Sequence, residues 1–79
     1  MKTVFVLIKE YGVDGVDFDI FETHEKAYFE MEDIAIELIK NYKHLAINKQ
    51  TGDIVEIVDL STEDHEMVYY LSIEERTIR

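Results

Sequence analysis

The chain has 79 residues and a formal net charge of −10, with 47% hydrophobic residues and no cysteine. This length predicts one domain over residues 1–79, and the apolar content predicts a folded core instead of an acidic disordered tail. The lack of cysteine excludes disulfides and thiolate metal sites. The negative charge disfavours direct binding to nucleic acid or anionic lipid and favours basic protein surfaces.

The first two elements are predicted to be strands joined as a hairpin. Residues Thr3–Lys9 read TVFVLIK and are apolar on both faces, which is typical of a central strand. A glycine-containing loop over residues 10–15 leads to a second strand, Val16–Phe21, in which apolar and acidic residues alternate. The alternation predicts that its apolar residues face the core and its acidic residues face water: Val16, Phe18 and Ile20 inward, Asp17 and Asp19 outward.

A long helix is predicted next, capped by Thr23 and running to about Tyr42. At about 100° per residue, its apolar side chains form one stripe, which we expect to face the core. The members of this stripe are Ala27, Met31, Ile34, Ala35, Leu38 and Tyr42. Phe29 and Ile36 point about 150° away from the stripe, within a ring of charged residues, and resemble a small contact surface. The alternatives are ordinary scattered surface residues or cover by the chain's own tail.

Three shorter strands complete the prediction, namely Leu45–Ile47, Ile54–Leu60 and Met67–Ile73. Polar turns over residues 48–53 and 61–64 connect them, and the tail over residues 74–79 is expected to fray. The register of the middle strand stays open because both of its faces carry apolar residues. The order ββαβββ predicts an α+β fold of two layers, with one long helix on an antiparallel sheet.

No catalytic, cofactor or metal site is predicted. The three histidines lack metal-ligand spacing, and the two at the ends of the helix, His24 and His44, are about 30 Å apart. Asp14, Asp17 and Asp19 could attract calcium, but the glycine and distal glutamate of the calcium loop are missing. No nucleophile motif, phosphate loop or dinucleotide fingerprint occurs, so we expect a protein without enzymatic activity.

The negative charge is concentrated in one block of the sequence. Ten carboxylates and a single lysine, Lys26, occur between Glu10 and Glu37. Because the first loop, second strand and helix should be neighbours, we expect one continuous acidic surface with a charge density near that of a nucleic-acid backbone. The alternative is that these carboxylates only keep the chain in solution and bind no partner.

These patterns predict a partner-binding surface, and its partner is expected to be basic. The candidate residues are Glu10, Tyr11, Asp14, Asp17, Asp19, Glu22, Glu25, Phe29, Glu32, Asp33 and Ile36. The leading hypothesis is an inhibitor that occupies a basic, nucleic-acid-binding surface of a larger host protein. The second is a small homodimeric structural or regulatory protein, and the third is an ion- or small-ligand-binding domain.

The first half of the chain resembles small prokaryotic and phage domains in which two strands lead into a helix with a Thr/Ser and E-K-A start. Here that start is Thr23, Glu25, Lys26 and Ala27. This likeness concerns the fold and implies no activity. As a small, acidic, cysteine-free chain, the whole is similar to phage-encoded inhibitors of host defence such as anti-CRISPR proteins. The likeness is compositional, so no functional residue carries over from it.

The chain is expected to be cytoplasmic and to lack membrane contact. Its longest apolar run, Val4–Ile8, is too short to span a bilayer, and its amino terminus lacks the pattern of a signal peptide.

Overall fold

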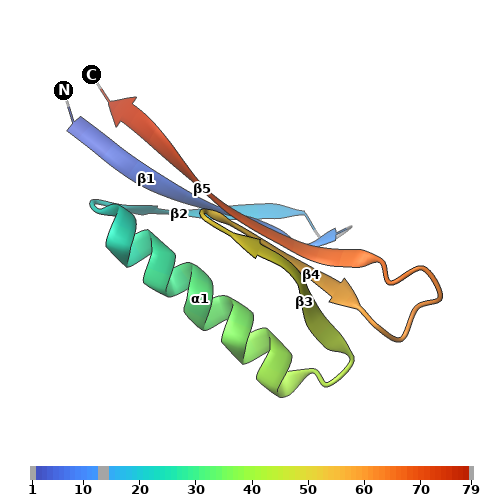
Figure 1. Ribbon diagram of the computed structural model, residues 1–79. Helices are drawn as coiled ribbons and strands as arrows, with labels where there is room; N and C mark the ends of the chain where they lie inside the picture. Colours follow the sequence, from blue (N-terminus) through green and yellow to red (C-terminus); the bar gives the residue numbers. More distant parts are fainter. Residues whose placement is uncertain (1, 13–14, 79) are drawn as a thin grey trace.

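The computed structural model describes residues 2–12 and 15–78 and confirms the α+β class (Figure 1). Helix α1 covers one face of a five-stranded antiparallel sheet, whose strand order is β2-β1-β5-β4-β3. The elements are β1 (Lys2–Glu10), β2 (Val16–Phe21), α1 (His24–Asn41), β3 (Leu45–Thr51), β4 (Ile54–Asp59) and β5 (Met67–Ile78). The first strand is central, as its sequence predicts, and β2 and β3 form the two edges.

Helix α1 has the predicted cap and the predicted buried stripe. Thr23 Oγ1 accepts a hydrogen bond of 3.2 Å from the backbone N–H of Lys26, which satisfies one free donor of the first turn. Ala27, Met31 and Ala35 are buried against the sheet, and Ile34 and Leu38 are half-buried beside them. The expectation that Tyr42 belongs to this stripe is wrong, because Tyr42 terminates the helix with an extended backbone and its side chain is 49% exposed.

The core lies between the helix and one face of the sheet. The central strands contribute Leu7 from β1, Val55 and Ile57 from β4, and Leu71 and Ile73 from β5. Each of these side chains is less than a tenth exposed. This arrangement resolves the open register of β4, because Val55 pairs with Leu71 and Ile57 pairs with Tyr69.

The predicted orientation of β2 is wrong. Its register against β1 pairs Leu7 with Asp19 and Lys9 with Asp17, so both aspartates lie on the helix side of the sheet. The apolar residues therefore point to the face without a helix. Val16, Phe18 and Ile20 are 65%, 59% and 59% exposed.

Two predicted boundaries in the second half are also wrong. The last strand does not end at Ile73, because β5 continues to Ile78 and pairs with the start of β1, Lys2 opposite Ile78. Strand β3 extends to Thr51, so its hairpin turn is confined to residues 52–53, where Gly52 has a φ of 53°. The predicted polar turn near residues 61–64 is present between β4 and β5.

Within residues 2–12 and 15–78 there is no helix with the length and apolar character needed to cross a membrane.

Candidate binding surface

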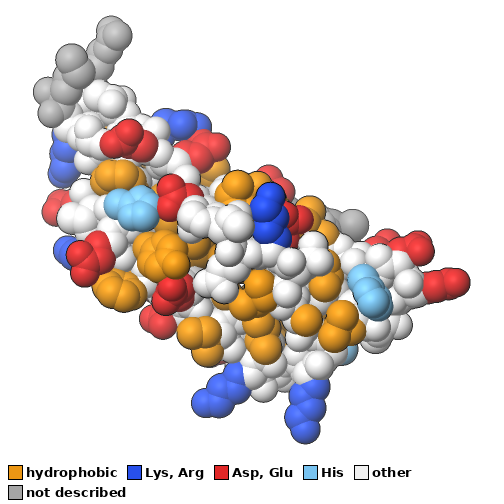
Figure 2. Space-filling model, viewed as in Figure 1, with side chains coloured by type: hydrophobic (Ala, Val, Ile, Leu, Met, Phe, Trp, Pro, Cys, Tyr) orange, Lys and Arg blue, Asp and Glu red, His pale blue; other side chains and the backbone are white. Residues whose placement is uncertain are grey.

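The outer side of α1 carries two exposed apolar side chains. Phe29 and Ile36 lie on the same side of the helix, seven residues apart, and are 55% and 59% exposed. This exposure confirms the prediction that they point away from the core. In the space-filling view, apolar side chains lie among carboxylates over this helix, and lysines gather near its carboxyl end (Figure 2).

The carboxylates of α1 differ from those of β2 in their ion pairing. Among the residues that the structure describes, no ion pair joins a helix carboxylate to a lysine, arginine or histidine. Glu32 is half-buried and accepts a hydrogen bond from Tyr28, which raises the pKa of the Tyr28 hydroxyl. The remaining carboxylates on this helix are exposed, and they are Glu25, Glu30, Asp33 and Glu37.

The carboxylates of β2 are in a different electrostatic state. The Lys9 ammonium is 2.7 Å from Asp19 Oδ2 and 3.7 Å from Asp17 Oδ2, and the Lys9 residue is only 9% exposed. The hydrogen bond from Lys9 to Asp19 raises the pKa of the Lys9 ammonium, and the charges of Tyr11, Asp19 and Asp17 act in the same direction. A cation of the protein itself therefore lies between the two aspartates.

Other predicted site residues are spread over the molecule. Glu22 pairs with Lys2 at 3.5 Å, while Glu10 lies beside Tyr70 at the other end of β1. Asp14 lies outside the described residues. The structure thus brings together Glu25, Phe29, Glu32, Asp33 and Ile36 on α1, whereas the other described members of the predicted set lie on other elements.

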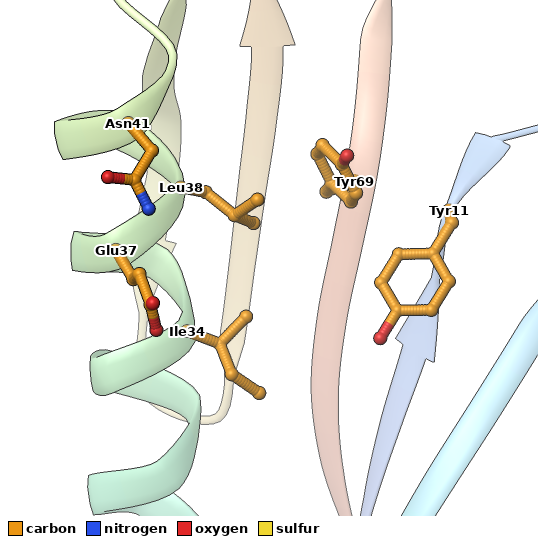
Figure 3. Close-up of a pocket in the computed structure, with 6 residues that line it drawn as sticks. All are labelled: Tyr11, Ile34, Glu37, Leu38, Asn41 and Tyr69. Carbon is orange, nitrogen blue, oxygen red and sulfur yellow. The ribbon is translucent and has the colours of Figure 1, made fainter.

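A groove beside the helix adds residues that sequence reasoning missed. Its volume is about 390 Å³, and its lining residues are Tyr11, Ile34, Glu37, Leu38, Asn41 and Tyr69. Ile34 and Leu38 point from α1 toward the sheet, where the two tyrosines form the opposite wall (Figure 3). The rings of Tyr11 and Tyr69 meet edge to face with centroids 5.5 Å apart. Four of its lining side chains are aliphatic or aromatic, and one, Glu37, is a carboxylate.

The sequence indicates a role for only some of the residues that line this groove. Tyr11 belongs to the partner-binding residues that the sequence predicts, and in the structure it is half-buried against Tyr69. Ile34 and Leu38 were assigned to the core stripe. These residues lie where α1 stops covering the sheet. The position of that boundary depends on how α1 crosses the sheet, so the sequence alone does not predict it.

The histidines make no metal cluster in the described part of the chain. His24 Nε2 is 2.5 Å from Asp53 Oδ1, which connects the start of α1 to the β3–β4 turn. The His24 ring also stacks on Tyr28, with centroids 6.1 Å apart and planes at 22°. The same ring meets Phe5 of β1 edge to face, with centroids 5.6 Å apart, so the amino end of the helix contacts the sheet.

Comparisons with protein-family models, with curated proteins and with solved structures gave no match to this chain.

Proposed function

We propose that this chain is a non-enzymatic binding module that docks on a basic protein surface through the outer side of α1. The observation that carries the proposal is the exposed pair Phe29 and Ile36, which lies among helix carboxylates that form no ion pair in the described part of the protein. An apolar centre with a charged rim is the usual arrangement of a protein interface.

The two kinds of residue have different tasks in this proposal. The carboxylates attract a lysine- or arginine-rich partner over distance and raise the association rate. Phe29 and Ile36 lose water on contact and slow dissociation. The groove between α1 and Tyr69, on the helix side of the sheet, offers a second apolar contact.

In its narrower form, the proposal is that the basic partner is a larger host protein whose surface normally binds nucleic acid. The chain would then act as an inhibitor in the cytoplasm of the host, in the manner of phage-encoded anti-CRISPR proteins. The net charge of −10 supports this form. Because Lys9 pairs with Asp17 and Asp19, we infer that α1, more than β2, supplies the charge that competes with nucleic acid.

The test is capture of partners from host lysate by the immobilised chain at low and high salt. A charge variant removes three helix carboxylates, Glu25→Gln with Glu32→Gln and Asp33→Asn. A matched control removes three carboxylates from the β4–β5 loop, Glu63→Gln with Asp64→Asn and Glu66→Gln. We expect a basic partner that is lost at high salt and with the helix variant, and retained with the loop variant.

Two outcomes oppose the proposal: capture of no basic protein, or equal loss with both triple variants. Once a partner is identified, a short DNA or RNA duplex tests the narrower form. Displacement of the chain by the duplex supports competition for one surface, whereas a ternary complex excludes it.

A further inference from the structure

The face of the sheet opposite α1 has no element over it among the described residues (Figure 1). Exposed apolar side chains lie on this face at the β1–β2 pair. The register places Val6 opposite Ile20 and Ile8 opposite Phe18, so two rows of large apolar side chains run side by side. Val6 and Ile8 are half-buried, while Phe18 and Ile20 are each 59% exposed. A contiguous apolar patch of this kind marks a contact surface in a folded protein.

The charges on this face are nearly balanced, unlike those on the helix side. Cations and carboxylates stand next to each other in the same rows, and the pairs are Lys2 with Glu22, Arg76 with Glu74, and Lys49 opposite Glu56. Glu10 adds one further carboxylate at the end of β1. A basic partner would therefore be attracted to the other side of the molecule.

A nearly neutral, apolar face suits a second copy of the same chain. A two-fold interface places each patch against its own copy, so an acidic patch would repel itself, whereas apolar rows with paired charges do not. The five strands contain 6 to 12 residues each. At about 4.8 Å between strands and about 3.3 Å per residue, they give a planar footprint of roughly 600 Å². Because side chains project from this plane, the accessible area is larger than the planar footprint. It therefore comes closer to the roughly 800 Å² that each partner buries in a stable dimer.

We propose that two copies of this chain pack their helix-free sheet faces together, with Phe18 and Ile20 at the centre of the interface. This arrangement buries the exposed residues of β2 that the helix leaves uncovered. It also leaves both α1 helices on the outside of the dimer. The proposal is independent of the proposed function, because it uses the opposite face of the sheet.

Sedimentation equilibrium of the full chain at micromolar concentration is the first test. We expect a mass of twice 9.3 kDa for the native chain and a mass of 9.3 kDa for Phe18→Lys with Ile20→Lys. The matched control is Phe29→Lys with Ile36→Lys, which changes equally exposed residues on α1 and should leave the dimer intact. A monomeric native chain, or a dimer lost only with the helix pair, would overturn the proposal.

A second measurement does not depend on the folding of the lysine variants. Because the chain has no cysteine, Phe18→Cys and Phe29→Cys each allow a single spin label per copy. In the proposed dimer, the distance between labels is shorter at position 18 than at position 29, which lies on the outer side of α1. A shorter distance at position 29, or no defined distance at position 18, contradicts the face-to-face dimer.

Discussion

Lys9 Nζ lies 2.7 Å from Asp19 Oδ2 across the β1–β2 pair, and Asp17 lies within 3.7 Å of the same ammonium. The acidic residues of β2 and α1 therefore differ in whether they pair with a cation of the protein itself. The two β2 carboxylates share one cation, whereas the α1 carboxylates take part in no ion pair within residues 2–12 and 15–78.

Replacing Lys9 with methionine should therefore destabilise the fold. The two aspartates would face each other without a cation, and the loss of charge-assisted hydrogen bonding in a partly exposed site costs about 1–2 kcal/mol. Urea denaturation measures the free energy of unfolding. Lys43→Met removes an exposed lysine after α1 and serves as the control, with a change of less than about 0.5 kcal/mol. Equal effects of the two substitutions would mean that the Lys9 pair adds nothing to stability.

The orientation of α1 gives a second prediction. Two alanine substitutions, one on the inner side of the helix and one on the outer side, test it. Met31 is 0% exposed, so Met31→Ala should lower the free energy of unfolding by about 2–4 kcal/mol through lost burial and a cavity. Ile36 is 59% exposed, and Ile36→Ala should change it by less than about 0.5 kcal/mol. A comparable loss for Ile36→Ala would show that this side chain is buried in solution.

The turn after β4 gives a prediction about pH. Asp59 Oδ1 accepts hydrogen bonds from the Ser61 hydroxyl at 2.6 Å and from the Ser61 backbone N–H at 2.9 Å. These bonds hold the pKa of the Asp59 carboxyl below its ordinary value of 3.8. A lowered pKa stabilises the fold at pH values above 3.8, and this contribution is lost as the pH falls through the folded-state pKa.

Asp59→Asn should therefore lower the melting temperature at pH 7, and the difference from the native chain should shrink toward pH 3. Asp64→Asn, in the same loop, is the matched control and should show no such convergence. If the melting temperatures of the Asp59 variant and the native chain differ equally at both pH values, the Ser61 hydrogen bonds do not act through ionised Asp59.

Sequence periodicity was sufficient to predict the helix, its cap and its inner and outer sides. The spacing of Ala27, Met31 and Ala35 decides which side meets the sheet, and Thr23 decides where the helix starts. These features depend on local backbone geometry, so they need no knowledge of the neighbouring strands. The exposure of Phe29 and Ile36 follows from the same periodicity.

Periodicity could not decide which face of β2 the helix covers. Alternation shows that Phe18 and Asp19 point to opposite faces, but the choice depends on the pairing of Leu7 with Asp19 and on a single compensating cation, Lys9. The extension of β5 to Ile78 likewise depends on a distant partner, the start of β1. The groove at Tyr11 and Tyr69 was missed because its walls come from separate elements that meet only in the folded protein.

The kinetics of partner binding test the central claim most directly, once capture has supplied the basic partner. With the triple variant at Glu25, Glu32 and Asp33 we predict an association rate about tenfold lower, and with Phe29→Ser and Ile36→Ser a dissociation rate about tenfold higher. The loop control at Glu63, Asp64 and Glu66 should change neither rate. Unchanged rates for both helix variants, or an equal fall in association with the loop control, would contradict a binding surface on α1.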